Sequence, residues 1–463
     1  MLHTRSKADS PTFGRRVVTA GNKLVTASPA LLALVVILMV VLLFAGLLSL
    51  PMSAADGIAT APYDAIFTAA SAVTVTGLVT VNTAEHWSFF GQVVILLGIQ
   101  IGGLGIVTIA LLLSRAVTRH LGVRGRILAQ QGIGTTKLGE VQSLLRIVIV
   151  TSLALELALA LILIPRFIIV EQSWSQGLWH GIFYAISAFN NAGFVTHTDG
   201  LVGFEGDYWI LVPIMVGVFI GSFGFPIFLV LMIMKWHWRR WTLHTKLTLS
   251  TTSILLGVGA ALWGLLEWSN SKTIGDMSVW DKIFHSIFAS TMMRSGGFSL
   301  TDPSDSHAIT LLATDALMFV GGGSASTAGG IKVTTIALLF LAILAEAKGD
   351  KHLMIFGRNI PEDALRVAIS VTFLGATLVL GATGLIMLVS DAPLDRILFE
   401  VISGFATCGL SVGLSEELPP AGKYVLAALM FAGRVGPIGL ASALAIRRRN
   451  LLFRYPEERP IIG

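Results

Sequence analysis

Long apolar runs alternate with short amphipathic stretches along this chain, and the alternation occurs four times. A helix needs about 20 apolar residues to cross a hydrocarbon core, which the long runs supply and the short stretches do not. Each unit therefore predicts an outer spanning helix, a short re-entrant helix, a loop and an inner spanning helix. The units cover 29–115, 143–235, 246–345 and 365–446, between tails at 1–28 and 447–463.

These units predict an all-α polytopic membrane protein in which eight spanning helices surround a pseudo-fourfold pore. Irregular backbone at membrane depth must face protein or a water-filled cavity, so the four loops are expected to point inward. The short helices are expected at 62–73, 178–189, 280–292 and 394–405. The outer helices are expected at 29–50, 143–165, 246–268 and 365–390, and the inner helices at 91–115, 208–235, 308–345 and 422–446.

One glycine lies in each of the four loops, and a second glycine lies at a similar distance along each inner helix. The loop glycines are Gly77, Gly193, Gly297 and Gly409. The inner-helix glycines follow them by 25, 28, 25 and 24 residues, at Gly102, Gly221, Gly322 and Gly433. A single pair of this kind is usually explained by close helix packing. Two glycine positions that recur at similar spacing in four units favour an internal repeat.

The distribution of charge agrees with a membrane protein whose two termini face the cytoplasm. Only 13% of the 463 residues are charged and 54% are hydrophobic, whereas soluble domains carry about 25% charged residues. The proposed cytoplasmic segments hold 25 of the 32 Lys and Arg residues and the proposed outer segments hold 6, as the positive-inside rule expects. Topology and contact with lipid headgroups explain the basic patches, so no nucleic-acid partner is expected. The single cysteine, Cys408, excludes an internal disulfide.

The four loops have the composition of a filter for a dehydrated cation. Backbone carbonyls can replace the water of a cation without trapping it, and glycine reaches the positive φ angles that aim such carbonyls at one axis. The carboxyl-terminal end of each short helix also favours a cation. The expected filter residues are Thr74, Val75, Thr76, Gly77, Asn190, Asn191, Ala192, Gly193, Arg294, Ser295, Gly296, Gly297, Ala406, Thr407, Cys408 and Gly409.

Acidic residues in the outer loops could concentrate cations at the mouth of the pore, although most acidic loop residues are merely solvated. The candidates are Asp56, Asp64, Glu85, Asp199, Glu205, Asp207, Asp302, Asp305, Glu416 and Glu417.

The third inner helix cannot be continuous, because residues 321–330 are rich in glycine and in small hydroxyl residues that disfavour a helix. A flexible segment below the filter, acting as a gate, is the interpretation that this composition favours, and a small-residue packing surface is the alternative. The segment consists of Gly321, Gly322, Gly323, Ser324, Ala325, Ser326, Thr327, Ala328, Gly329 and Gly330.

Four polar residues within apolar segments are further candidates. Arg434 lies at the depth of the gate segment in the fourth unit, and an arginine inside a membrane is a functional hypothesis by default. We expect it to face the cavity, donate to loop carbonyls and repel cations, with a snorkelling or structural arginine as the alternative. Lys332 is expected to bind the lower end of the loop or mark the cytosolic boundary. Arg294 is expected to anchor the pore loop, and Glu156 to make structural hydrogen bonds.

The motifs TVTGL (74–78), NNAGF (190–194) and GGIKVTT (329–335) together resemble the Trk/Ktr/HKT superfamily of potassium transporters, and most of all its KtrB membrane subunits. The resemblance runs from about residue 29 to the end. It implies potassium uptake through a filter with one glycine per repeat, and an intramembrane loop at 321–330 that works with the arginine at 434. It also implies a homodimer in a bacterial inner membrane and a cytosolic, nucleotide-binding partner ring similar to KtrA. We expect the uptake to be passive or stimulated by Na⁺, with no cofactor in this chain.

Two loops depart from the family pattern. Residues 294–298 read RSGGF where the family usually has Thr-Ala before the glycine, and Cys408 replaces an apolar residue. Both changes conserve small size, so the backbone role is expected to survive, while the fine selectivity is not determined by the resemblance.

Three rival functions fit the sequence less well. A TrkH-type subunit would carry an additional amino-terminal pair of helices, and only a 28-residue polar tail precedes the first helix here. A rocking secondary transporter would have inverted repeats, whereas an even number of spans separates these units. A membrane enzyme needs a cluster of His, Asp and Glu, and none is evident at catalytic spacing. The glycine run at 321–330 also lacks the GxxxxGK[ST] spacing of a phosphate loop.

Overall fold

The computed structural model describes residues 29–120, 139–234, 237–350 and 352–446. The predicted tails, 1–28 and 447–463, lie outside the described residues. Sixteen α-helices are described, together with one small hairpin in which β1 (Met354–Ile355) pairs with β2 (Arg358–Asn359), so that Met354 lies opposite Asn359. The part described is therefore mostly helical.

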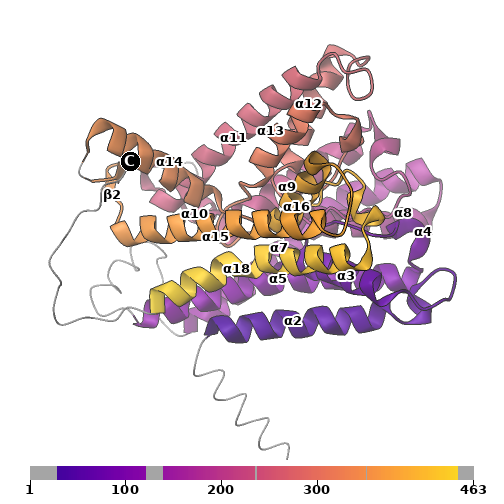
Figure 1. The fold of residues 1–463 in the computed structure, drawn as a ribbon, viewed down its shortest axis with the longest axis horizontal. Helices are drawn as coiled ribbons and strands as arrows, with labels where there is room; N and C mark the ends of the chain where they lie inside the picture. The colour runs from indigo at the N-terminus through magenta and orange to yellow at the C-terminus, as the bar shows by residue number, and fades with distance from the viewer. Residues whose placement is uncertain (1–28, 121–138, 235–236, 351, 447–463) are drawn as a thin grey trace, which may run out of the picture.

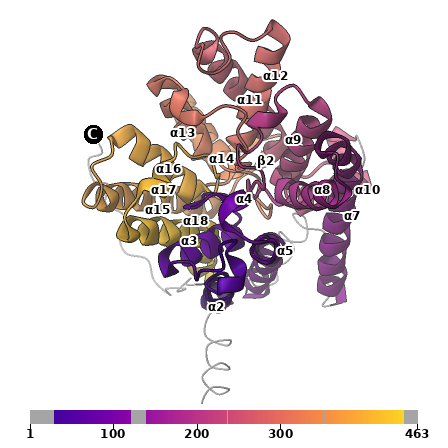
Figure 2. The ribbon, with the colours of Figure 1, turned by 90° about the vertical axis from the view of Figure 1, so that its right-hand side faces the viewer.

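The helices fall into four consecutive groups, each with a long outer helix, a short helix and one or two inner helices. The outer helices are α2 (Pro29–Leu48), α7 (Gly139–Glu171), α11 (Leu243–Glu267) and α15 (Glu362–Met387). The short helices are α3 (Pro62–Thr74), α8 (Trp174–Phe189), α12 (Val279–Met292) and α16 (Leu394–Ala406). In the end-on view of Figure 2 the four colour ranges occupy four separate sectors.

The inner helices differ among the groups. Two are continuous, and two are split into an upper and a lower helix. The continuous helices are α5 (Phe89–His120) and α18 (Pro420–Ile446); the split pairs are α9 (Tyr208–Phe223) with α10 (Phe225–Met234), and α13 (Ala308–Met318) with α14 (Val333–Lys348). The short connecting helices are α4 (Thr83–His86), α17 (Leu414–Glu417), η1 (Pro51–Ser53), η2 (Val202–Phe204), η3 (Trp238–Arg240) and η4 (Pro303–Asp305).

Local sequence signals account for where the short helices begin. The Ser278 side chain accepts a hydrogen bond from the Asp281 backbone N–H at the start of α12, and Ser173 does the same for Gln176 at the start of α8. Such caps satisfy amides that have no partner within the helix. The helix α3 begins instead with Pro62, whose fixed φ suits the first helical position.

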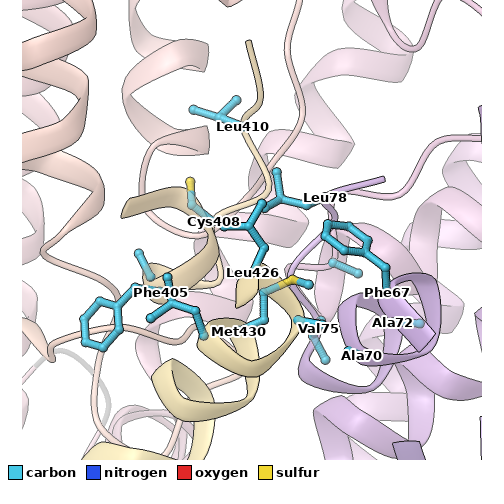
Figure 3. Packing of buried hydrophobic residues seen from close by; sticks show 14 of the residues in the cluster. Phe67, Ala70, Ala72, Val75, Leu78, Phe405, Cys408, Leu410, Leu426 and Met430 are labelled. Atoms are coloured by element: carbon cyan, nitrogen blue, oxygen red, sulfur yellow. The ribbon is translucent and has the colours of Figure 1, made fainter. Parts of the chain in front are cut away.

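Apolar side chains pack between groups at the centre and stay exposed on the outer helices. Figure 3 shows Phe67 and Val75 on one side facing Leu426 and Met430 of α18, and all four are buried. On the outer helices, by contrast, large apolar residues such as Met39, Leu161 and Phe373 are more than half exposed. A helix with an exposed apolar face is suited to a lipid environment.

Three of the described helices are long and apolar enough to cross a membrane, namely Val148–Glu171, Leu243–Glu267 and Glu362–Met387. Shorter apolar helices within the described residues are Leu34–Leu48, Phe89–Gly105, Tyr208–Phe223 and Ala308–Met318. The total of eight spanning helices therefore stays a prediction.

Candidate functional site

The four glycine loops share one backbone conformation. In each loop the glycine has a positive φ, and so does the residue two positions before it. The φ values are 56° and 95° at Val75 and Gly77, 59° and 69° at Asn191 and Gly193, 72° and 74° at Ser295 and Gly297, and 47° and 94° at Thr407 and Gly409. Since non-glycine residues rarely adopt positive φ, its occurrence at the same position of four loops indicates a shared structural requirement.

In each loop the backbone N–H of the residue just before the glycine donates a hydrogen bond to the short helix that precedes the loop. Thr76 N donates to Ser71 O, Ala192 N to Ser187 O, and Cys408 N to Ser403 O, each at 2.8 Å. The same serines also use their side chains: Ser71 and Ser403 accept from the glycine amides, and Ser187 donates to Phe194 O at 2.9 Å.

These serines were missed in the sequence. A hydroxyl residue occurs six positions before every loop glycine, at Ser71, Ser187, Thr291 and Ser403, and this recurrence was the signal that could have identified them.

The four loops contact one another in order along the chain and then back to the first. A methyl group built on Gly77 would lie 2.3 Å from Ala192 O, one on Gly193 would lie 2.9 Å from Gly297 Cα, and one on Gly297 would lie 2.7 Å from Cys408 O. A methyl group on Gly409 would lie 2.3 Å from Thr76 O. No side chain fits at any of these positions without displacing the backbone of the next loop.

Glycines of the inner helices pack against the ends of the short helices. A methyl group on Gly102 would lie 2.1 Å from Val73 O, one on Gly221 would lie 2.1 Å from Phe189 O, and one on Gly433 would lie 1.9 Å from Phe405 O. Each carbonyl belongs to the residue four positions before the loop glycine of the same group. The second glycine register therefore reflects a repeated backbone contact in three of the four groups.

The two loops that depart from the family pattern are joined to each other. Ser295 Oγ donates to Thr407 O at 2.6 Å and accepts from Gly329 N at 3.2 Å. The Cys408 thiol contacts Met292 O at 3.4 Å. Both side chains are buried, so they bridge the third and fourth loops.

A buried polar network supports the second loop from behind. Asn190 Nδ2 donates to Glu156 Oε1 at 3.0 Å and to Gln100 Oε1 at 3.2 Å, and Gln100 Nε2 donates to both Glu156 oxygens. Asn191 Nδ2 donates to Ser222 Oγ at 2.7 Å. Glu156 thus connects α7, α5 and the second loop. The sequence predicted only structural hydrogen bonds for this residue.

Residues 319–332 separate α13 from α14, and part of this segment lies directly against two of the glycine loops. Thr327 Oγ1 donates to Gly221 O at 2.9 Å and to Asn191 Oδ1 at 3.1 Å. A methyl group on Gly329 would lie 2.0 Å from Thr407 Oγ1. The segment therefore contacts the second and fourth groups as well as its own.

Three basic residues surround this segment. Arg294 Nη2 donates to Gly321 O at 3.2 Å, so it joins the third glycine loop to the irregular segment. Lys332 Nζ donates to Ala328 O at 2.6 Å. Arg434 is 3% exposed, and none of its guanidinium nitrogens has a hydrogen-bond partner in the part of the chain that the structure describes. The expected bonds from Arg434 to loop carbonyls are therefore not formed among the described residues, whereas Arg294 and Lys332 each donate to a carbonyl of the segment.

Several acidic residues proposed for the pore mouth are bound to basic residues. Asp64 pairs with Lys423 at 2.8 Å, Asp207 with Arg166 at 2.7 Å, and Glu417 with Arg396 at 3.0 Å. The hydrogen bond from Arg396 lowers the pKa of the Glu417 carboxyl below its usual range. For these residues the expectation of free mouth charges is wrong, since their charge is compensated locally.

The structure also assembles a cluster that the sequence did not reveal. Glu171, His180 and His197 place one ligand atom each within 4.8 Å of one another. The spacing of 9 and 17 residues carries no motif, and only the fold brings the three side chains together.

Exposed apolar outer helices that enclose a buried, glycine-rich backbone site define the class of membrane transport proteins. Residues 29–450 match the TrkH family of cation transport proteins, and the chain belongs to this family. The resemblance found in the sequence is thereby confirmed, and the family is one of transporters, not of enzymes.

Three relatives are similar over most of their length. The Ktr system potassium uptake protein B of Bacillus subtilis (strain 168) is 36% identical over 400 residues, which cover 86% of this chain and 89% of that protein. The protein of the same name from Vibrio alginolyticus is 34% identical, covering 90% and 91%. The potassium/sodium uptake protein NtpJ of Enterococcus hirae is 33% identical, covering 92% and 95%.

A solved structure has the same fold. The crystal structure of the potassium transporter TrkH from Vibrio parahaemolyticus aligns with a TM-score of 0.69 at 18% sequence identity, over 89% of this chain and 84% of that one.

Proposed function

We propose that this chain is the potassium-translocating subunit of a Ktr-type uptake system. The observation that carries the proposal is the closed order of contacts among the four glycine loops, whose φ pattern is the same in every loop. Four backbone segments that meet in this order are suited to present carbonyls to one cation. Support for K⁺ as the cation comes from the names of relatives that are 33–36% identical.

The proposed filter consists of residues 74–77, 190–193, 294–297 and 406–409, placed around a pseudo-fourfold axis within eight spanning helices. The buried hydroxyl groups and Asn190 brace the loops from behind and hold their backbone in place. In this arrangement the side chains set the rigidity of the filter and the main chain supplies the ligands.

The proposed gate consists of residues 321–330 with Lys332 and Arg434. Its contacts with Asn191 and Thr407 place it next to two filter loops. Arg434 and Lys332 interact electrostatically with each other, and the positive charge of the Arg434 guanidinium at this depth would oppose a passing cation. Opening would require Arg294 to release the Gly321 carbonyl.

The remaining features of the system are also proposals. The relatives named as Ktr system proteins support a cytosolic partner similar to KtrA, and the relative named for potassium and sodium uptake supports a role for Na⁺. Stimulation of K⁺ uptake by Na⁺ is the form of that role that we propose. A homodimer in a bacterial inner membrane with both termini in the cytoplasm fits the charge distribution and the exposed outer helices. K⁺ is the cargo, and no further cofactor is proposed.

Uptake in potassium-import-deficient cells tests the function. We expect the chain, with a KtrA-like subunit, to restore growth at low potassium and to carry K⁺ and Rb⁺ in preference to Na⁺. Gly193→Ser should abolish this, because φ is +69° and a methyl group there would lie 2.9 Å from Gly297 Cα. The matched control is Gly203→Ser, where nothing lies within 4 Å of the added carbon. Failure of every combination despite normal expression would contradict the proposal.

A further inference from the structure

Two histidines and a glutamate meet just beyond the second glycine loop. Glu171 is the last residue of α7, His180 lies on α8, and His197 follows Gly193 by four residues. Glu171 Oε1 lies 2.5 Å from His180 Nδ1 and 3.2 Å from His197 Nε2. The side chains are 11%, 15% and 22% exposed, so the cluster is largely enclosed but can be reached from outside.

The surroundings orient these groups toward one another. Tyr184 Oη lies 2.8 Å from His197 Nδ1, which leaves Nε2 as the ring nitrogen directed at Glu171. Phe167 stacks on His197 with centroids 5.8 Å apart and meets His180 edge to face. Glu171 Oε2 is buried and has no hydrogen-bond partner within the described ranges. The cluster therefore has an oriented imidazole, an apolar wall and a carboxylate oxygen without a hydrogen-bond partner among the described residues.

The geometry points to a Zn²⁺ site formed by Glu171, His180 and His197, and this is our proposal. Two imidazole nitrogens and one carboxylate are a donor set that zinc uses, with water as a fourth ligand. Mg²⁺ and Ca²⁺ prefer oxygen ligands only. Zinc bonds of about 2.1 Å place tetrahedral ligand atoms roughly 3.4 Å apart, so atoms that now lie within 4.8 Å need to move by only about 1 Å.

Bound zinc would join three separate parts of the second group. It would link the end of the outer helix, the short helix and the segment that leaves the glycine loop. The Tyr184 hydroxyl would act as the outer partner that fixes the His197 tautomer, as such partners do in metal sites. This inference concerns binding alone and does not rest on the identity of the transported ion.

The proposal is tested by titrating the purified full-length protein with Zn²⁺. Isothermal calorimetry measures the binding, and the midpoint of thermal unfolding measures the stabilisation. We expect saturable binding at one Zn²⁺ per chain with a higher unfolding temperature, and no comparable response to Mg²⁺. His180→Gln and His197→Gln should each weaken binding by more than about 100-fold, and Tyr184→Phe by about 10-fold, because ligands matter more than their outer partners.

His307→Gln is the matched control, since His307 is an exposed histidine after the third loop and should bind zinc as the wild type does. Size-exclusion profiles of the variants establish that they are folded. Absence of saturable binding in the wild type would overturn the proposal. So would undiminished binding in both folded histidine variants, or an equal loss in His307→Gln.

Discussion

The inner segments of the first and third groups have glycines at the same distance from their loops, yet one is helical and the other is not. In α5, Gly102 lies against Val73 O and the helix continues past it. In the third group the helix ends at Met318 and resumes at Val333. The residues between form hydrogen bonds with the second group and with the loop of their own group in place of a helical ladder.

The difference shows that a glycine at a given depth does not itself determine the structure. Residues 98–107 also hold four glycines, but Ile and Leu lie between them and favour the helix, whereas the five glycines of 321–330 are separated only by Ser, Thr and Ala. Backbone groups freed from a helix must find other partners. Arg294 and Ser295 offer such partners to Gly321 O and Gly329 N, so the irregular segment is specified by side chains outside it as well as by its own composition.

The largest expected effect separates packing from flexibility in α5. Gly102→Val should reduce uptake by at least about tenfold and destabilise the protein by about 2 kcal/mol, because the added carbons overlap Val73 O. Gly105→Val on the same helix has open space and should change stability by less than about 0.5 kcal/mol. Uptake rates and thermal unfolding measure both. Equal effects of the two variants would mean that helix propensity, and not the contact, governs this helix.

A second prediction addresses the charge beside the irregular segment. Arg434→Ala should raise K⁺ flux about 30-fold, since a unit charge ~8 Å from a cation at an effective dielectric of 20 costs about 2 kcal/mol. Its unfolding temperature should not fall, because the buried guanidinium has no partner among the described residues. Flux assays in vesicles, with the exposed Arg239→Ala as control, test this. Unchanged or lower flux in a folded variant would contradict the gate.

A smaller rise is expected when the anchor of the segment is removed. Arg294→Gln should lose the hydrogen bond to Gly321 O, and K⁺ flux should increase about threefold, because a charged hydrogen bond contributes about 1.5 kcal/mol and glutamine replaces part of it. Arg166→Gln, which removes a cation paired with Asp207 instead, should leave flux unchanged. A fall in flux of Arg294→Gln with normal expression would show that the bond supports conduction and not closure.

The smallest effect concerns the contact between α5 and the second loop. Glu156→Gln should lower K⁺ over Na⁺ discrimination about twofold, because it weakens a charge-assisted bond to Asn190 that is worth roughly 1.5–3 kcal/mol in full. Competitive uptake of Rb⁺ and Na⁺ measures it. Glu362→Gln, at the exposed start of α15, is the control. Discrimination equal to the wild type would limit Glu156 to a structural role.

Much of the helix arrangement could be predicted from the sequence. The lengths of the apolar runs and the spacing of the glycines depend directly on the backbone structure. The structure has a helix in each of the twelve predicted ranges, although α7 extends to Glu171 and the second inner helix is split at Gly224. A positive φ of 92° at Gly224 explains the split. The contacts of Gly102, Gly221 and Gly433 give the inner-helix register a physical basis.

What the sequence did not predict are contacts between side chains far apart in the chain. The choice of Arg294 over Arg434 as the donor to the irregular segment depends on angles between groups, which no local pattern encodes. The pairing of Asp64 with Lys423 and the meeting of Glu171 with two histidines have the same origin. The sequence does not show which charged loop residue pairs with which, because the pairs form only when the fold brings the residues together.

The contact between Gly409 and Thr76 has a consequence for biogenesis. These residues are 333 positions apart, and their loops complete the order of contacts that begins with Gly77 and Ala192. Contacts between distant parts of a chain form late, because a long loop must close first. Ribosomal synthesis delivers the first loop long before the fourth, so three loops must wait in the membrane with their glycine backbones uncovered. A chain arrested before residue 409 is therefore expected to remain sensitive to membrane proteases until the last group arrives.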